Sequence, residues 1–289
     1  MKISMKKINV EKYKQSIERY FDNSKSKSNL KIHKNLVEIK SKGKLLIIGD
    51  LHGDIYALCT ILNNVKIDDF LTNKENILIS LGDLVDRGKN GIEVIYTLTN
   101  LGNEYPGQVI ILRGNHEVSR PYEVFPFNFN EELLEKYGEQ EKNLLEFTIE
   151  NFFKKLPLAA YITKEIFLVH GGIPIQVPSL EEIEEAEPDS DIGYQLRWND
   201  PRDNIEDHAP SDRGHNIYYF GSKITEEFLK KNNLEMVIRS HEKPDIKGYK
   251  TNHNNKIITI FSAKNVYNLP KASYAIYIPN KKILKIKTF

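Results

Sequence analysis

Residues 79–94 read ISLGDLVDRGKNGIEV, and the turn inside this stretch decides the fold. An apolar run ends at Leu81, and two aspartates, an arginine and two glycines follow within residues 82–88. The apolar run is typical of a buried strand, but strand formation does not explain so much charge directly after it. The pattern indicates that the chain leaves a sheet here and places polar side chains at the sheet edge.

The same arrangement occurs four more times along the chain. The polar residues that follow the five apolar runs are Asp50 and His52 after LLIIG, Asp83 after ILISLG, Asn115 and His116 after VIILRG, His170 after IFLV, and His241 after MVIRS. Ligands of open α/β sheets bind where the carboxyl ends of the strands meet, so we expect these side chains to converge on one crevice. Glycines beside them permit sharp turns and the close approach of a ligand.

The elements around these turns predict an α/β fold. Residues 10–22 have the apolar spacing of a helix and lead into the polar NSKSKSN, so we expect residues 1–29 to form an N-terminal helix and linker. From residue 30 onward strand-like runs alternate with helical patterns, which favours one domain over residues 30–289. The closing strands have little helix between them and are expected to add antiparallel. The helical patterns lie at residues 55–64, 91–101 and 131–156.

The composition narrows the class of protein. No run of the 289 residues is long enough to span a bilayer, and the N-terminus lacks the apolar core of a signal peptide, so we expect a cytoplasmic protein without a membrane partner. The 41 Lys and Arg nearly balance the 40 Asp and Glu, which gives no support to a nucleic-acid partner. Cys59 is the only cysteine; it excludes an internal disulfide and is expected to be a buried apolar residue.

Most of these polar residues form a donor set suited to hard or borderline divalent ions. Six ligands on one ion would leave no room for water or substrate, so two ions fit better, with Asp83 bridging them. Two ions about 3.5–4 Å apart can hold a hydroxide and clamp a phosphoryl group during in-line displacement. We expect manganese, with iron or zinc as alternatives. The six donors are Asp50, His52, Asp83, Asn115, His170 and His241.

Three residues beside the donor set are candidates for separate tasks. The planar guanidinium of Arg87 can bind a pair of phosphate oxygens. Asp86 can accept a hydrogen bond from His116 and so fix the tautomer of its ring. His116 directly follows Asn115 and is well placed as a general acid for a leaving group.

The motifs GDLHGD, GDLVDRG, LRGNHE, HGG, SDRG and RSHE resemble those of the phosphoprotein phosphatases, the protein serine/threonine phosphatases among the calcineurin-like metallophosphoesterases. The likeness runs from about residue 30 to residue 280. It implies a central β-sandwich of two mixed sheets flanked by helices, which residue patterns alone do not predict. It also implies one-step hydrolysis of phosphomonoesters by a metal-bridging hydroxide, with phosphorylated proteins as substrates and regulatory subunits as partners.

The resemblance also implies a role for each site residue. Asp50, His52 and Asp83 would bind one metal, and Asp83 with Asn115, His170 and His241 the second. His116, paired with Asp86, resembles the family's proton donor. Arg213, from SDRG, and Arg87 resemble its phosphate-binding arginines, with Asn115 and His116 beside them at the phosphate. Arg113 and Arg239 adjoin metal motifs and are expected to be structural.

Two stretches depart from the family pattern. Residues 262–268 read SAKNVYN where eukaryotic members read SAPNYC, so Val266 takes the place of the aromatic residue and Tyr267 comes one step later. Residues 118–130, VSRPYEVFPFNFN, carry four aromatic residues and are compatible with either a wall of the substrate groove or a surface loop.

Two other functions are compatible with these residues. The first is a metallophosphoesterase acting on nucleotides, such as a dinucleoside polyphosphate hydrolase, or on nucleic acid. The second is a phosphate-binding protein without turnover. GNHE, where the nucleotide hydrolases usually read GNHD, together with SDRG favours the protein phosphatase, and the complete donor set with His116 argues against a protein without turnover.

Overall fold

The computed structural model describes residues 7–23, 29–118, 124 and 127–289. The polar connection at 24–28 and most of the aromatic stretch at 118–130 lie outside the described residues.

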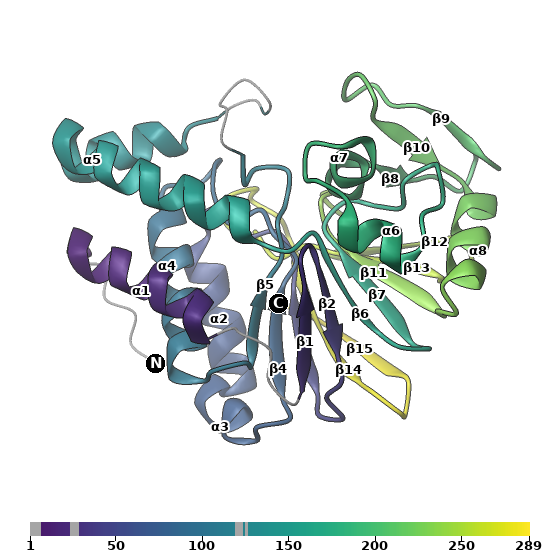
Figure 1. Cartoon of the computed structure of the whole chain (residues 1–289), viewed down its shortest axis with the longest axis horizontal. Coiled ribbons are helices and arrows are strands. Elements are labelled where there is room, and N and C mark those ends of the chain that lie inside the picture. Colours follow the sequence, from purple (N-terminus) through teal and green to yellow (C-terminus); the bar gives the residue numbers. More distant parts are fainter. Residues whose placement is uncertain (1–6, 24–28, 119–123, 125–126) are drawn as a thin grey trace.

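Two mixed β-sheets pack face to face at the centre of the molecule (Figure 1). The first sheet contains, in spatial order, β15 (Ile283–Thr288), β14 (Ser273–Ile278), β3 (Leu45–Ile48), β4 (Ile77–Ser80) and β5 (Val109–Ile111). The second contains β1 (Leu30–His33), β2 (Leu36–Ile39), β6 (Ala159–Ile162), β7 (Ile166–Val169), β11 (Met236–Arg239), β13 (Ile257–Ile260) and β12 (Tyr249–Asn252). The β-sandwich expected from the resemblance is therefore confirmed.

Helices cover the outer faces of both sheets, and a small third sheet lies at one end (Figure 1). The first sheet is covered by α1 (Val10–Asn23), α2 (Ile55–Val65), α3 (Ile67–Thr72), α4 (Gly91–Glu104) and α5 (Phe129–Lys155). The second sheet is covered by α6 (Leu180–Glu185), α7 (Asp191–Trp198) and α8 (Ser222–Lys231). The third sheet contains β8 (Asp200–Pro201), β10 (Tyr218–Phe220) and β9 (His208–Pro210).

The central strands β3 and β7 are apolar and buried at every position, because both of their faces are covered. In β3, Leu45 and Ile47 belong to the core between the two sheets, whereas Leu46 and Ile48 pack against the helices. Successive side chains of a strand point to opposite faces, so a strand buried on both sides reads as a continuous apolar run. β3, β4 and β5 run parallel. Of the closing strands, β14 joins antiparallel to β3 and β12 antiparallel to β13, as expected, but β13 pairs parallel with β11.

The predicted helices are present, with one difference. The pattern at 131–156 predicts one helix, but α5 is broken at Gly138, whose φ of 76° and ψ of 172° are not helical. Such a backbone conformation is essentially restricted to glycine, and Gly138 begins a polar run, GEQEKN at residues 138–143, that separates the apolar residues of the two halves of α5. The expectation that Cys59 is buried is wrong, because its side chain is only partly covered at the outer side of the core around α2.

α1 packs onto the helical layer rather than standing apart from it. Tyr13, Ile17 and Tyr20 are buried in the core that α1 shares with α4 and α5. The Tyr20 hydroxyl donates to the Val109 carbonyl of β5. Among the described helices, none is both long and apolar enough to cross a membrane.

Candidate dimetal centre

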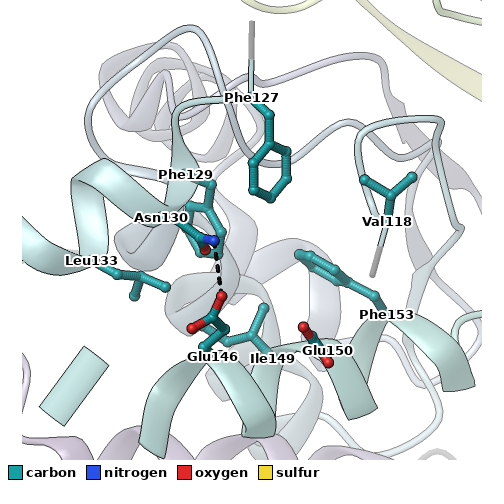
Figure 2. Close-up of a pocket in the computed structure, with 9 residues that line it drawn as sticks. All are labelled: Val118, Phe127, Phe129, Asn130, Leu133, Glu146, Ile149, Glu150 and Phe153. Atoms are coloured by element: carbon teal, nitrogen blue, oxygen red, sulfur yellow. Dashed lines mark hydrogen bonds between the residues drawn. The ribbon is translucent and has the colours of Figure 1, made fainter. Parts of the chain in front are cut away.

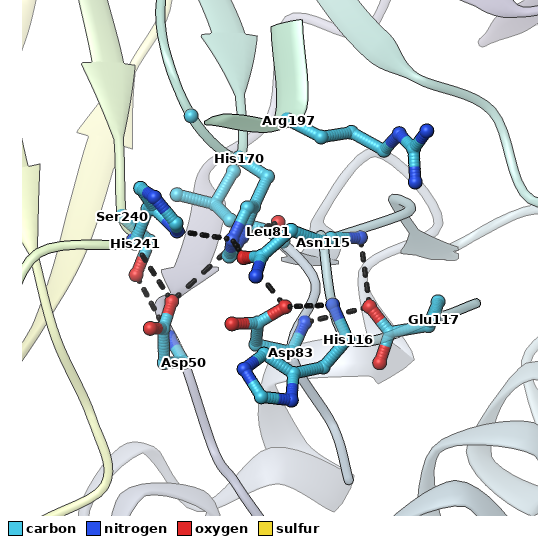
Figure 3. Close-up of polar contacts among 12 residues, drawn as sticks. Asp50, Leu81, Asp83, Asn115, His116, Glu117, His170, Arg197, Ser240 and His241 are labelled. Carbon is cyan, nitrogen blue, oxygen red and sulfur yellow. Dashed lines mark hydrogen bonds and ion pairs between the residues drawn. The ribbon is translucent and has the colours of Figure 1, made fainter. Parts of the chain in front are cut away.

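The carboxyl ends of five strands meet at one end of the sandwich. β3, β4 and β5 are parallel neighbours in the first sheet, and β7 and β11 are parallel neighbours in the second. Figure 3 shows the side chains from both sheets converging. All six predicted donors are at most 8% exposed: Asp50, His52, Asp83, Asn115, His170 and His241. The structure therefore brings together every residue that the strand-end pattern predicted.

Several of the loops that leave these strands adopt a left-handed backbone. His52, Asp83 and His241 have φ values of 45°, 54° and 68°. Such values are uncommon for residues with a side chain and cost about 1–3 kcal/mol each, so the surrounding structure has to hold them. The Asp83 carbonyl accepts hydrogen bonds from the amides of Leu51 and His52 at 2.9 and 2.8 Å, which locks two of these loops together.

Glu117 anchors the same loop and was not identified as a site residue from the sequence. Its carboxylate accepts three backbone hydrogen bonds, from Asp83 and Leu84 at 2.8 Å and from Gly114 at 2.7 Å. Burial, together with the nearby Asp83 charge, raises the pKa of Glu117 to about 7. The sequence carries one signal for Glu117, which is its position directly after Asn115 and His116 in RGNHE. That position indicated only a choice between protein phosphatases and nucleotide hydrolases.

Gly114 permits the close approach of the loops after β4 and β5. A Cβ atom at this position would lie 2.2 Å from Oδ1 of Asp83 and 2.5 Å from its backbone nitrogen. Both atoms are fixed by other contacts, so a side chain could not be accommodated without moving Asp83.

Two histidines expose the same ring nitrogen to the centre. The Nδ1 atom of His52 lies 2.9 Å from the Val85 carbonyl, and that of His170 lies 3.0 Å from the Leu81 carbonyl. A carbonyl oxygen only accepts hydrogen bonds, so each Nδ1 donates and the lone pair of the neutral ring is on Nε2. Hydrogen bonds of this kind orient histidine ligands of metal ions.

Asp83 lies between these two imidazoles. Its Oδ2 is 3.4 Å from Nε2 of His52, and its Oδ1 is 3.3 Å from Nε2 of His170. Two potential metal-binding groups share this carboxylate, one with His52 and His116 and the other with His170 and His241. The arrangement fits two cations with a common bridging ligand.

Asp50 lies beside both groups. Its Oδ2 is 3.6 Å from Nε2 of His52, and its Oδ1 accepts a hydrogen bond from the His241 amide at 3.0 Å. Oδ2 is buried and has no hydrogen-bond partner among the described residues. A buried carboxylate oxygen without a partner is costly, and a bound cation would satisfy it.

The atoms around His170 also fit a bound cation. Its Nε2, which carries a lone pair, lies 2.9 Å from Oδ1 of Asn115 and 3.2 Å from Nδ1 of His241. Lone pairs of nitrogen and oxygen repel one another at such distances unless a proton or a metal ion lies among them. This mixed set of oxygen and nitrogen donors suits a borderline divalent ion.

The pKa values reflect a site that stabilises positive charge. Burial lowers the pKa of His52, but the carboxylates of Asp50 and Asp83 outweigh burial and raise it to about 9. Burial raises the pKa of Asp83, but the charges of His170 and His116 outweigh that effect and bring it well below its usual value. The two carboxylates therefore favour a cation between these rings.

The pKa of His241 shifts in the opposite direction. Burial lowers it well below the ordinary value, and the positive charges of Arg213, His170 and Arg239 add to the effect, although Asp200 opposes it. The ring is therefore neutral, which is the form in which histidine binds metal ions.

His116 and Asp86 form a pair beside the donor set. Nδ1 of His116 donates to Oδ2 of Asp86 at 2.6 Å, and the His116 amide donates to Oδ1 of Asp83 at 3.0 Å. The His116 ring also meets the His52 ring edge to face, with 4.8 Å between the centroids. The pairing leaves Nε2 of His116 available for proton transfer.

The arginines occupy two kinds of position. Arg213 donates from Nε to Oδ2 of Asp200 at 2.7 Å and keeps 35% of its side chain exposed. Arg239 is fully buried and donates to Oδ1 of the same carboxylate at 2.7 Å. Arg113 donates to the Glu117 carbonyl at 2.9 Å. Arg87 is exposed on the loop after β4.

The departure at residues 262–268 places a different aromatic residue at the site. The Tyr267 ring lies 5.5 Å from that of His52 and 5.2 Å from that of Phe261, whereas Val266 faces Gly88. Burial raises the pKa of Tyr267, and the charges of Arg87, Asp50, Asp83 and Arg213 also act on its hydroxyl. The aromatic side chain of this loop thus comes from one residue later in the sequence.

Asp54 holds that loop against the site. Its two carboxylate oxygens accept hydrogen bonds from the amide and the side chain of Asn265 at 2.6 and 2.9 Å. Oδ1 also caps the first turn of α2 through the Ala57 amide at 3.0 Å. The last residue of the GDLHGD motif therefore ties two loops together.

Comparisons with known proteins agree with this geometry. The family described as calcineurin-like phosphoesterase matches residues 43–244. The serine/threonine-protein phosphatase 6 catalytic subunit of Caenorhabditis elegans is 33% identical over 241 residues, which cover 82% of this chain and 69% of the relative. A probable serine/threonine-protein phosphatase of Encephalitozoon cuniculi is 32% identical over 234 residues, covering 79% of this chain and 49% of the relative. The chain thus spans about half the length of the latter protein.

A solved structure of a Saccharomyces cerevisiae protein serine/threonine phosphatase with similarity to human phosphatase PP5 has the same fold. It superposes with a TM-score of 0.79 at 24% sequence identity, covering 98% of this chain and 90% of the other.

Proposed function

Because the chain belongs to the calcineurin-like phosphoesterase family and, within it, to the phosphoprotein phosphatases, we propose that it is a metal-dependent protein serine/threonine phosphatase. It hydrolyses phosphoserine and phosphothreonine esters in one step. The observation that carries the proposal is that the two oxygens of Asp83 face different imidazoles while the His116–Asp86 pair stands beside them.

The six donors of the candidate centre would hold the metals. Asp50 and His52 would contribute to one ion, Asn115, His170 and His241 would contribute to the second, and Asp83 would be shared by both. Two divalent ions bound there lower the pKa of a water molecule and neutralise charge on the phosphoryl oxygens. We propose manganese, because the set mixes carboxylate, amide and imidazole donors and contains no sulfur.

The protein's own groups orient the phosphate and deliver the proton. Arg87 and Arg213 bind phosphoryl oxygens, and the Asp200 carboxylate keeps the Arg213 guanidinium in place. As the bond between phosphorus and the seryl oxygen breaks, Nε2 of His116 donates its proton to that oxygen. Asp86 accepts a hydrogen bond from the opposite ring nitrogen, Nδ1, and so holds the ring in the orientation that the transfer requires.

The partners and location of the protein belong to the same proposal. Phosphorylated proteins are its substrates, and regulatory subunits are its expected partners, since one relative bears the name of a catalytic subunit. A cytoplasmic location agrees with the single, unpaired cysteine.

The test is phosphate release by metal-stripped protein supplied with Mn²⁺ on three substrates: a phosphothreonine peptide, a dinucleoside polyphosphate and single-stranded DNA. We expect preference for the peptide. Preference for either nucleotide substrate would contradict the substrate assignment, and the absence of turnover on all three would favour a phosphate-binding protein. The Asp83→Asn variant, prepared in parallel, identifies phosphate released by a contaminating enzyme.

A further inference from the structure

The residues proposed to hold the general acid and the phosphate are adjacent and share an unusual backbone. Asp86 and Arg87 have φ values of 65° and 69°. Two consecutive left-handed residues with side chains are rare, and they persist only where surrounding contacts hold them. The contacts that hold this pair therefore also set the direction of the Arg87 side chain.

Those contacts come from the first residues of α5. Oδ1 of Asp86 accepts hydrogen bonds from the amides of Asn128 and Phe129 at 3.0 and 2.9 Å, and so caps α5 from outside the helix. In return, Oδ1 of Asn128 accepts a hydrogen bond from the Arg87 amide at 2.8 Å. The exchange is reciprocal, with the loop capping the helix and the helix residue binding the loop.

The Asn128 side chain does not form the hydrogen bond that is usual for an asparagine directly before a helix. Asparagine at the residue before a helix usually accepts a hydrogen bond from an amide of its own first turn. Asn128 makes no such bond within the described helix. Its side-chain oxygen accepts a hydrogen bond from the Arg87 amide instead, although an ordinary cap would stabilise the helix.

The start of α5 is itself fixed to the neighbouring helix. Both carboxylate oxygens of Glu132 accept hydrogen bonds from the first turn of α4, from the Gly91 amide at 3.0 Å and the Ile92 amide at 3.1 Å. Lys136 donates to Glu132 at 3.0 Å and to Glu93 of α4 at 2.6 Å. These contacts fix the start of α5 and therefore the position of Asn128 relative to Arg87.

We propose that Asn128 is a positioning residue that holds Arg87 in its left-handed conformation, so that the guanidinium binds the phosphoryl group. This inference rests on the proposed function, in which Arg87 binds phosphate. The Arg87 charge acts on the hydroxyl of Tyr267, whose ring lies 5.5 Å from that of His52, so Arg87 lies in the neighbourhood of the dimetal centre.

The test is the Asn128→Ala variant in the complete chain, assayed with Mn²⁺. Loss of one hydrogen bond to a backbone amide predicts a rise of about 3- to 10-fold in KM and in the inhibition constant of inorganic phosphate. The amide of residue 128 still holds Asp86, so the ratio of kcat on a phosphothreonine peptide to kcat on an aryl phosphate should stay as in the wild type.

Two further variants separate positioning from a general loss of structure. Asn130→Ala removes a hydrogen bond of 2.8 Å to Glu146 between the two halves of α5, in the pocket drawn in Figure 2, and leaves Arg87 untouched. We expect it to change the melting temperature but neither constant. Asn128→Asp keeps an oxygen that accepts the Arg87 amide, and we expect it to recover most of the phosphate affinity.

The outcomes distinguish this inference from the function on which it rests. If the wild type does not act on the phosphopeptide, the proposed function fails. If the wild type is active and Asn128→Ala lowers only the melting temperature, with KM and phosphate inhibition unchanged, the positioning role is wrong and Asn128 is structural. Equal changes in Asn130→Ala and Asn128→Ala would overturn the role as well.

Discussion

Asp83 is the residue that joins the two potential metal groups, because its oxygens lie 3.4 Å from His52 and 3.3 Å from His170. Asp83→Asn replaces one of these oxygens with an amide nitrogen that cannot bind a cation. We expect the variant to retain fewer than two ions per chain after dialysis against Mn²⁺, measured by elemental analysis. Full retention of two ions by a folded variant would contradict the bridging role.

His116 is expected to act on the leaving group. His116→Ala should slow turnover of a phosphoserine peptide by about 10²- to 10⁴-fold, the range for a lost general acid. An aryl phosphate with a good leaving group needs the proton less and should be slowed much less.

His116 also belongs to one of the two potential metal groups, so metal content is measured on the same variant. Retention of both ions would agree with the acid role. Equal slowing on both substrates, or loss of an ion, would contradict it.

At this scale the sequence predicted all the residues that follow strand ends, because a residue's place at the end of an apolar run is a local property. It did not predict that Tyr267 faces His52, since that depends on Asp54, which is distant in sequence and holds Asn265 and thereby the loop. Arg213 was recognised only through the family resemblance, for its loop follows none of the five apolar runs.

At the scale of elements, His253 connects the hairpin of β12 and β13 to α8. Its Nε2 lies 3.1 Å from the Arg202 carbonyl and therefore donates, so Nδ1 accepts from the Thr225 hydroxyl at 2.8 Å. Burial lowers the pKa of His253, although Asp203 and Glu226 oppose the shift. Protonation would remove the acceptor that Thr225 uses.

The lowered pKa of His253 determines the direction in which the stability of the protein changes with pH. A histidine whose pKa is lower in the folded state contributes stability above its unfolded value of about 6.5, and the contribution is lost as pH falls through the folded value. Asparagine also tolerates the left-handed φ of 51° at this position. The melting temperature of the wild type should therefore exceed that of His253→Asn by more at pH 7.5 than at pH 5.5. A difference independent of pH would contradict the assignment.

The elements themselves were well predicted, because apolar periodicity is local and strong in strands buried on both faces. The pairing of the strands was not, since β14 lies beside β3 and β2 beside β6 through contacts between distant parts of the chain. The break of α5 at Gly138 was not predicted, because apolar residues at helical spacing lie on both sides of the polar run at 138–143. The two-sheet architecture came from the family resemblance rather than from these patterns.

At the scale of the whole molecule, we propose that residues 30–289 form the catalytic domain and that residues 1–29 support it. Tyr13, Ile17 and Tyr20 are each at most 4% exposed. Burial of a large apolar side chain contributes about 1.5–3 kcal/mol, so three of them amount to a large share of a typical folding free energy of about 5–15 kcal/mol.

Deletion of residues 1–29 should therefore lower the melting temperature by about 10 °C or more at this size, while Mn²⁺ binding at low temperature persists. Tyr20→Phe, which removes only the hydroxyl bonded to Val109, is the mild control. An unchanged melting temperature after the deletion would show that α1 is dispensable, and loss of metal binding from the folded remainder would contradict the proposed division.

The most direct test of the central claim is a Mn²⁺ titration of metal-stripped protein, in which bound ions per chain and phosphate release from a phosphothreonine peptide are measured on the same samples. The account predicts that activity rises only as the second ion binds and reaches its plateau at about two ions per chain. Full activity at one ion per chain, or no activity with two bound, would contradict a dimetal serine/threonine phosphatase.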